Sequence, residues 1–539
     1  ISQGIGIGRK KIEATQLKVA EVTTSSMEAY NYFLRGREAV EKFYFDEAKQ
    51  FLEKAIDLDS TFAMAYYYLA RAYLLTSDLR AYVEALEKAK TYSQKASDRE
   101  RLYIEASYAN FIEKNPQKRL RILKDIAKKY PREKWVHFEL GNYYRDKNMF
   151  NQAKEEYYKA LDLDPNYGDA MNSLAYTYSD TGDFEKAIEY FEKYASVSPG
   201  DANPIDSMGE VYLRMGKLDE AIAKYKEVLE VKPDFYTTRL SIGYIYALKE
   251  NYPEALKWVE QLINIALTPL LKSDGYLNKG FYHSWLGSFE QSLREFQRAS
   301  DLAEEMRNEI FVARIEFMKG YVYYDMGELE FSQRSFNSWF DLFIEYMPQF
   351  EPDNTAVHSF NLGLVELKQG RIDSAKSRLS KMKSLLPEID PSNKDQAEFL
   401  YDILQGEVLL AEGSVGNAIA ILEKASPLGR PPLIQLIIPY NFPFFKDTLA
   451  RAYQQNGEID KAIAEYVRLI TFDPDAEERC LVHPKNYYRL AQLYEQKDFK
   501  GKAIEQYEKF LGLWKDADPG IVEVEDARKR LVGLKGENP

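Results

Sequence analysis

One motif returns along the chain at a fixed interval, and this regularity limits the fold more than any other feature. Three successive segments begin at Leu140, Leu174 and Met208, an offset of 34 residues each time. Each segment has a small residue, a tyrosine, a turn with Gly or Asn, and then an alanine, an aromatic residue and a proline. In the first segment these are Gly141, Tyr144, Ala153, Tyr157 and Pro165. A chain of this kind stacks units that each need only their neighbours to bury an apolar face.

The spacing inside a unit predicts two packed helices. Gly141 and Tyr144 are three positions apart and share one face of a first helix, whereas Ala153, Tyr157 and Ala160 lie at i, i+4 and i+7 on a second. Glycine inside a helix costs about 1 kcal/mol relative to alanine, so its presence there predicts a close approach of two backbones. The aromatic residues fill the space beside that crossing, and the proline ends the second helix.

The same register recurs over nearly the whole chain, at small residues that include Gly36, Ala70, Gly243, Gly280, Gly320, Gly363, Gly406, Ala450 and Ala491. We therefore predict an all-α fold, an α-α superhelix (solenoid) of about thirteen helix pairs in one continuous domain. Residues 1–25 are a lead-in, residues 26–519 the solenoid, and residues 520–539 a C-terminal cap helix and tail. The clearest repeats are at 134–235 and 443–517, and a packed Pro-rich insert lies at about 430–445. In the cap helix we expect Val522, Val524, Ala527 and Leu531 to face inward.

These motifs identify the chain as similar to the tetratricopeptide repeat family. The resemblance implies a solenoid that binds proteins or peptides, with the first helices lining the concave face. Two segments, VTTSSMEAYNYFLRGREAVEKFYFDEAKQFLEKAIDLD near the start and YEKFLGLWKDADPGIVEVEDARKRL at the end, narrow the resemblance. They resemble tetratricopeptide regions fused to bacterial serine/threonine kinases, nucleotide cyclases or winged-helix regulators.

Composition excludes some functions. There are 85 acidic and 72 basic residues, a formal charge of -13, so general nucleic-acid binding is not expected. No window approaches the roughly 18 uninterrupted apolar residues of a membrane helix. Cys480 is the single cysteine, so no internal disulfide can form. This favours a reducing compartment such as the cytoplasm, but it does not exclude an extracytoplasmic location. Because the chain starts at Ile1 and its first residues lack a signal peptide's apolar core, we expect a piece of a longer polypeptide, with a possible effector domain upstream.

The residues that catalysis would need are missing from the sequence pattern. The four histidines, His137, His283, His358 and His483, fall in or beside different repeats, and no nucleophile-elbow, zinc-protease or P-loop motif occurs. We therefore predict no enzyme activity, no cofactor and no metal site. The chaperone-tail carboxylate clamp of the resembled family is also not predicted, because among its Lys and Asn positions only Asn142 matches.

Carrying the family's ligand positions onto this chain gives two candidate zones on the concave face. The polar zone comprises Asn142, Asn172, Tyr176, Asn203, Asp206 and Glu210, and asparagine amides can pair with the N–H and C=O of an extended peptide. The aromatic zone comprises Tyr244, Phe281, Trp285, Phe317, Tyr321 and Tyr324, residue types typical of binding hot spots. The alternative is that the superhelix packs these aromatic side chains against its own helices.

A basic stripe provides a third candidate surface. Lys118, Arg121, Lys124 and Lys128 fall on one face of a predicted helix, with Leu120, Leu123 and Ile126 on another. The stripe fits an acidic partner or a phosphate, or it is simply a solvated face.

The sequence as a whole favours a protein- or peptide-interaction scaffold, the sensing or recruiting region of a multidomain bacterial signalling protein. A stand-alone assembly scaffold and a small-ligand sensor that uses the aromatic zone are the alternatives.

Overall fold

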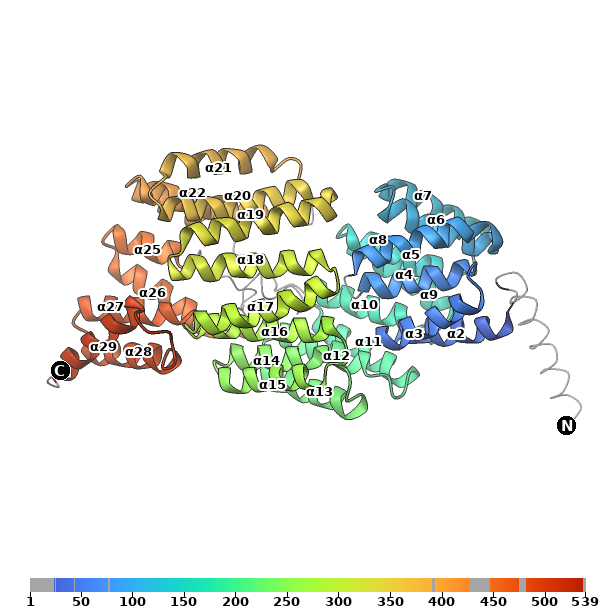
Figure 1. The fold of residues 1–539 in the computed structure, drawn as a ribbon, viewed down its shortest axis with the longest axis horizontal. Helices are drawn as coiled ribbons and strands as arrows, with labels where there is room; N and C mark the ends of the chain where they lie inside the picture. Colours follow the sequence, from blue (N-terminus) through green and yellow to red (C-terminus); the bar gives the residue numbers. More distant parts are fainter. Residues whose placement is uncertain are drawn as a thin grey trace, which may run out of the picture. The chain divides into compact units, whose positions relative to one another are not determined.

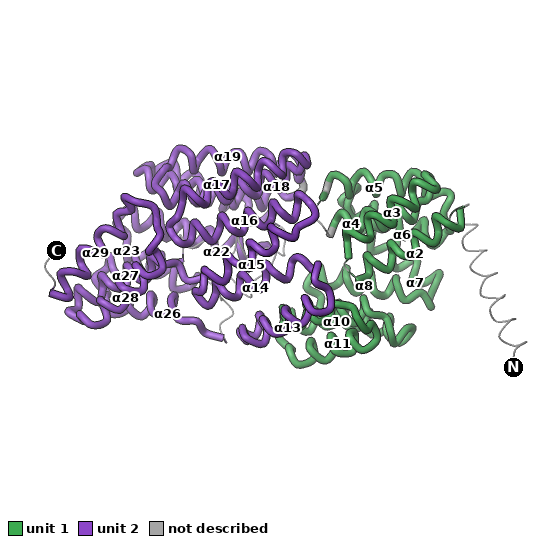
Figure 2. Tube along the Cα trace, turned by 60° about the horizontal axis from the view of Figure 1, so that its bottom comes forward, with its two compact units in different colours: residues 1–211 green, residues 212–539 purple. Residues whose placement is uncertain are grey.

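A computed structural model describes residues 24, 26–42, 44–75, 78–389, 393–425, 446–474 and 481–536. The Pro-rich insert at 430–445, Cys480 and nearly all of the lead-in 1–25 lie outside these ranges. The described residues form α-helices joined by short turns, without any strand among them, and they separate into two compact units, residues 1–211 and 212–539 (Figures 1 and 2).

Unit 1 contains the first helix pairs. Its helices are α2 (Met27–Glu41), α3 (Phe45–Leu58), α4 (Ala63–Leu75), α5 (Leu79–Tyr92), α6 (Asp98–Phe111), α7 (Pro116–Lys129), α8 (Lys134–Asp146), α9 (Phe150–Leu163), α10 (Gly168–Asp180) and α11 (Phe184–Val197), with the 3-10 turn η1 (Ser93–Lys95) and most of α12 (Asn203–Arg214).

Unit 2 continues the series. Its helices are α13 (Leu218–Val231), α14 (Thr237–Leu248), α15 (Tyr252–Ile265), α16 (Pro269–Trp285), α17 (Phe289–Glu305), α18 (Glu309–Met326), α19 (Leu329–Tyr346), α20 (Glu351–Lys368), α21 (Ile372–Leu385), α22 (Lys394–Ala411), α23 (Val415–Leu422), α25 (Thr448–Gln455), α26 (Ile459–Ile470), α27 (Pro484–Gln496), α28 (Lys500–Leu513) and α29 (Val522–Lys535), with the 3-10 turn η2 (Pro348–Phe350).

The helices pair as predicted. From α2 with α3 to α27 with α28, the described residues contain thirteen helix pairs, followed by the single helix α29. The predicted all-α solenoid of about thirteen pairs is confirmed.

The two helices of a pair differ in burial because they occupy different places in the stack. The second helix α9 buries one stripe, Ala153, Tyr157 and Ala160, which is the set predicted from its spacing. The first helix α10 buries residues on several sides, from Ala170 to Ser179, because its own partner and the neighbouring pairs cover it. First helices therefore form the inside of the stack, and second helices form the outside.

Small residues sit where the helices of a pair cross. A Cβ atom added to Gly280 would lie 2.6 Å from the ring of Phe296, inside any normal contact distance. The turns inside the pairs contain a residue with a left-handed backbone conformation. This residue is glycine at several positions, such as Gly182 with φ 81° and Gly287 with φ 73°.

Unit 2 closes on itself through its last helices. The indole nitrogen of Trp285, at the end of α16, donates to the carbonyl of Val482 over 2.9 Å. The indole nitrogen of Trp514 donates to the carbonyl of Trp285, also over 2.9 Å. Tyr487 on α27 donates to Glu250 in the turn before α15, over 2.8 Å. The C-terminal pairs therefore cover the turns of pairs that lie more than 190 residues earlier.

Helix α29 lies inside the predicted cap region 520–539. Val524 and Ala527 are buried as expected, but Val522 is 73% exposed, so its predicted inward orientation is wrong. Val522 is the first residue of α29, whereas the buried Val524 and Ala527 lie further into the helix.

Candidate functional site

The polar zone joins neighbouring first helices through side-chain hydrogen bonds. The hydroxyl of Tyr176 on α10 donates to Ser207 over 3.0 Å and to Glu210 over 3.1 Å, both on α12. The amide of Asn203 donates to the side-chain oxygen of Asn172 over 3.5 Å. Two sets of hydrogen bonds between α10 and α12 thus hold four of the six predicted polar residues, which we call the polar row.

Asn142 and Asp206 take separate places in this zone. Asn142, on α8, accepts a hydrogen bond from the hydroxyl of Tyr157 on its own partner helix, over 2.7 Å. Asp206 is half-buried on α12. In the described residues the amide nitrogens of Asn142 and Asn172 donate no hydrogen bond to protein, so they have donors to offer to a peptide carbonyl.

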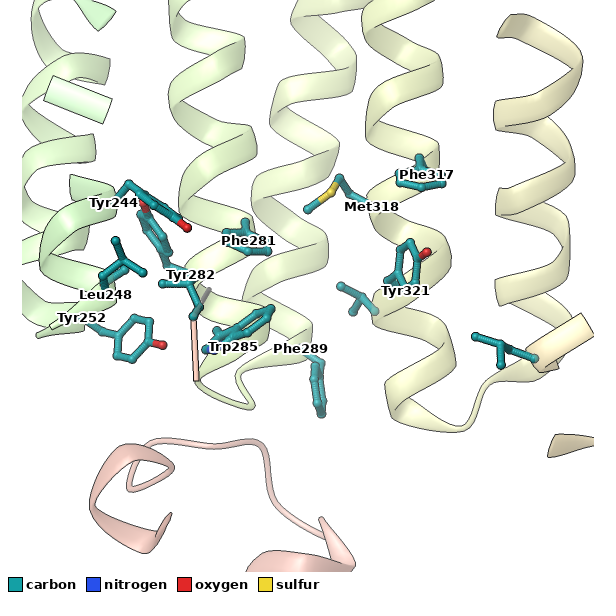
Figure 3. Packing of buried hydrophobic residues seen from close by; sticks show 14 of the residues in the cluster. Tyr244, Leu248, Tyr252, Phe281, Tyr282, Trp285, Phe289, Phe317, Met318 and Tyr321 are labelled. Atoms are coloured by element: carbon teal, nitrogen blue, oxygen red, sulfur yellow. The ribbon is translucent and has the colours of Figure 1, made fainter. Parts of the chain in front are cut away.

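The aromatic zone is covered by the chain itself. Five of its six rings are buried, with exposed fractions of 1% for Phe281, 3% for Trp285 and at most 9% for Tyr244, Phe317 and Tyr321. Figure 3 shows these rings packed between neighbouring helices. Tyr324 is partly buried against the same core.

The closure of unit 2 covers Trp285, whereas packing between helices of the repeats buries the other rings. Trp285 contacts the His483 ring at a centroid distance of 5.3 Å, and Phe317 packs on Trp339 at 4.7 Å. The expectation of an exposed aromatic strip is thus corrected, and the packing alternative describes these rings. A binding role for the six residues stays a prediction, which replacement of Trp285 can test.

Charged groups reinforce the same closure. Lys485 at the start of α27 bridges Asp325 at the end of α18, over 2.8 Å, and Glu523 on α29, over 3.0 Å. Burial lowers the pKa of His483 to about 4, which keeps its imidazole neutral beside this triad at neutral pH. The triad of Lys485, Asp325 and Glu523 pairs one positive charge with two negative charges. We therefore interpret it as a structural contact between helices.

The basic stripe lies on α7 as predicted. Arg121, Lys124 and Lys128 are exposed, and Lys118 is half-buried with its amine 2.8 Å from Glu113. Leu123 and Ile126 are buried on the opposite side, and Leu120 is half-buried. The stripe faces outward on a second helix, away from the polar zone.

Sequence reasoning missed a cation–π pair in unit 1. The guanidinium of Arg71 lies 5.2 Å from the centroid of the Tyr68 ring, and both residues are on α4. A signal for Arg71 was present: it directly follows Ala70, as Asn142 follows Gly141 and Tyr176 follows Ala175.

Comparison with protein families agrees with the geometry. Models for tetratricopeptide repeats match residues 29–62, 136–167, 156–189, 209–250, 447–476 and 484–513. The match at 136–167 covers the pair α8 and α9, and the match at 484–513 covers α27 and α28.

The chain is built from tetratricopeptide repeats.

Comparisons with curated proteins and with solved structures gave no strong similarity. No curated protein matches the chain. Among solved structures, MamA is 26% identical over 28% of this chain and 89% of its own, with a TM-score of 0.25. The APC/C hetero-tetramer Cut9–Hcn1 is 16% identical over 94% of this chain and 96% of its own, with a TM-score of 0.34. MamA from Desulfovibrio magneticus RS-1 is 18% identical over 31% and 96%, with a TM-score of 0.27.

Tetratricopeptide repeats mediate protein–protein interaction, so the repeats support a role as a protein-interaction scaffold. In the described part of the chain, no helix has the combination of length and apolar character that spanning a membrane requires.

Proposed function

We propose that this tetratricopeptide repeat chain recruits a partner protein by binding an extended segment of it on the first helices of unit 1. The observation that carries the proposal is the polar row of α10 and α12, together with Asn142 on α8. Asn142 and Asn172 have amide donors to offer, and a hydrogen bond joins Tyr176 and Glu210 in the row. An extended peptide has an unpaired N–H and C=O at each residue, and such side chains satisfy both.

The corresponding positions of unit 2 support the choice of unit 1. Tyr244, Phe281 and Tyr321 directly follow the small residue of their first helices, as Asn142, Tyr176 and Glu210 do in unit 1. In unit 2 these side chains are in the core. A small-ligand sensor that uses the aromatic zone is therefore the less favoured alternative.

The cellular setting is part of the proposal. The resemblance of the first and last segments to repeat regions of bacterial signalling proteins favours a recruiting region attached to an effector domain. A stand-alone assembly scaffold would use the same polar row, and the domain organisation of the full-length gene product separates the two.

A quantitative affinity pull-down with the full chain tests the binding surface. The double variant Asn142→Ala and Asn172→Ala removes both amides, while Asn151→Ala removes an exposed amide from the outer helix α9 of the same repeat. We expect the wild type and Asn151→Ala to recover the same partner, and the double variant to recover at least about fivefold less, since about 1 kcal/mol is lost per hydrogen bond. Equal recovery by all three proteins would place the binding surface elsewhere.

A further inference from the structure

The segment 514–518, which follows α28, docks on the segment 285–290 at the junction of α16 and α17. Besides the two indole hydrogen bonds of Trp285 and Trp514, three hydrogen bonds join these segments: the Ser288 hydroxyl to the Asp516 carbonyl over 2.9 Å, the Asp518 nitrogen to the Gly287 carbonyl over 3.0 Å, and the Glu290 nitrogen to the Asp518 carboxylate over 2.8 Å. We call this contact between the two segments, together with the hydrogen bond of Trp285 to Val482, the clasp.

His483 packs inside the clasp. Its side chain is 8% exposed, and its ring meets the rings of Trp285 and Trp514 edge to face, at centroid distances of 5.3 and 6.3 Å. The carbonyl that accepts from Trp285 belongs to Val482, the residue directly before it. Separation of the two segments would therefore expose the imidazole to water.

The imidazole has a hydrogen-bonding role that requires its neutral form. His483 is the N-cap of α27, and its Nδ1 accepts from the backbone nitrogen of Lys485 over 3.3 Å. An accepting Nδ1 carries no proton, so the proton of the neutral ring is on Nε2. A second proton would have to bind Nδ1, at which the N–H of Lys485 points, and it would place a positive charge at the N-terminus of a helix. The closed clasp therefore disfavours protonation.

The charged groups that face His483 do not offset this penalty. Asp325 on α18 has a carboxylate oxygen 3.8 Å from Nε2, but Asp325 and Glu523 on α29 already pair with Lys485. Burial lowers the pKa of His483 to about 4, and the attraction of Asp325 opposes only part of this effect. From α16 and α28 the imidazole is faced by the two uncharged indoles.

We propose that His483 makes the closure of unit 2 sensitive to acid: protonation of its imidazole opens the clasp, releases the last helix pair from the junction of α16 and α17, and uncovers Trp285. The inference goes beyond the proposed function, because the polar row belongs to unit 1 and the clasp to unit 2. Acid thus changes the surface that unit 2 presents to a partner.

The direction of the pH effect follows from the two states of the imidazole. In the open form the ring is in water with its ordinary pKa of 6.5, and in the closed form the pKa is about 4. The open form therefore takes up the proton first, and the closed form loses stability as pH falls from about 6.5 through about 4. From about pH 8 to about pH 5 the ratio of open to closed molecules rises roughly thirtyfold.

The neighbouring charges stay constant over this range. Although burial opposes it, pairing with Lys485 holds the pKa values of Asp325 and Glu523 below their ordinary values. The same pairing raises the pKa of Lys485, again against the effect of burial. The response between about pH 5 and about pH 8 is therefore assigned to His483.

Hydrogen–deuterium exchange of the full chain at about pH 8 and about pH 5, corrected for the pH dependence of intrinsic amide exchange, measures the opening. In the wild type we expect the protection of amides in 285–290 and 514–518 to fall roughly thirtyfold at the lower pH. Protection of α8 and α10 in unit 1 should not fall.

Two histidine variants separate the clasp from other effects of acid. Asparagine is a favourable N-cap that does not titrate, so His483→Asn should show equal protection of both segments at the two pH values. The control is His358→Asn, because burial also lowers the pKa of His358 to about 4, but its ring stacks on Phe340 and not on the clasp. This control should keep the roughly thirtyfold response.

Thermal melting at about pH 8 shows whether each variant is folded, and His483→Ser, with another favourable N-cap, replaces a His483→Asn protein that is not. Equal protection of the wild-type clasp at both pH values would overturn the inference, as would a loss of protection that persists in the His483 variants. Loss of the response in His358→Asn would also overturn it, because the acid sensitivity would then belong to general unfolding of unit 2.

Discussion

At the scale of single residues, one repeat position takes two different roles. The side chain directly after the small residue of a first helix is Arg71, Asn142 or Tyr176 in unit 1 and Phe281 or Tyr321 in unit 2. The polar side chains are half-buried, and the aromatic ones lie in the core. The same repeat position is therefore half-buried in unit 1 and part of the core in unit 2, and the proposed function depends on this difference.

Trp285→Ala tests this assignment in unit 2. The indole is 3% exposed and donates to the carbonyl of Val482, so its removal leaves a cavity and an unpaired carbonyl. We expect the free energy of unfolding to fall by about 3–5 kcal/mol in chemical denaturation. Tyr346→Ala, at a ring that is 42% exposed, is the control and should cost much less. Weaker partner binding with unchanged stability would instead restore the aromatic zone as a binding site.

Asp169→Asn tests the raised pKa of a half-buried carboxyl in the first turn of α10. In the folded chain the pKa is about 7, and the ordinary value is 3.8, so between these values the folded state holds a proton that the unfolded state has released. The contribution of Asp169 to stability therefore declines as pH rises from about 4 through about 7.

The variant cannot titrate, so it should be more stable than the wild type at pH 5 and pH 8, with the larger difference near pH 8, as urea unfolding at both pH values would show. Asp125→Asn changes an exposed carboxyl on α7 and should show no such difference between the two pH values. An Asp169→Asn effect that is equal at both pH values contradicts the raised pKa.

At the scale of helices, close crossings hold each pair together. A Cβ on Gly280 would contact the ring of Phe296 at 2.6 Å and the carbonyl of Ser292 at 3.0 Å. Gly280→Ala should therefore lower stability by roughly 1–3 kcal/mol, despite the better helix propensity of alanine. Gly512→Ala places the same atom in open space on α28 and should not destabilise. Similar melting temperatures for both variants would mean that the crossing at Gly280 relaxes without cost.

Helix α7 carries the basic stripe as an exposed surface. If an acidic partner docks there, the triple change of Lys118, Arg121 and Lys124 to Glu should weaken binding strongly at low salt and much less at high salt, because salt screens exposed charges. The charge-matched control is the triple change of Lys159, Lys186 and Lys193 to Glu on other outer helices, whose side chains are about half exposed. Affinity that does not depend on salt would leave only a solvated face.

The repeat pattern was sufficient to predict the helices but not the closure of unit 2. Gly141 and Tyr157 are close in sequence, and their spacing alone predicts that their helices cross. The contact of Trp285 with Val482 joins residues 197 positions apart, and no local pattern encodes it. For that reason the repeat pattern could not show that Trp285 is covered by the chain's own last helices.

At the scale of the whole chain, each unit has its own long-range contacts. In unit 1 the hydroxyl of Tyr44 accepts a hydrogen bond from the backbone nitrogen of Ala202, and in unit 2 the contacts of Lys485 with Asp325 and Glu523 fix the last helices. Binding should therefore be concentrated on the first helices of unit 1, where polar groups still have donors to offer.

Hydrogen–deuterium exchange on the full chain, with and without the captured partner, tests this most directly, because a bound segment suppresses the local opening of the helices that it covers. We predict slower exchange in α8, α10 and α12 with little change in α14, α16 and α18. Slower exchange confined to α7, or to the helices of unit 2, would contradict a binding surface on the first helices of unit 1.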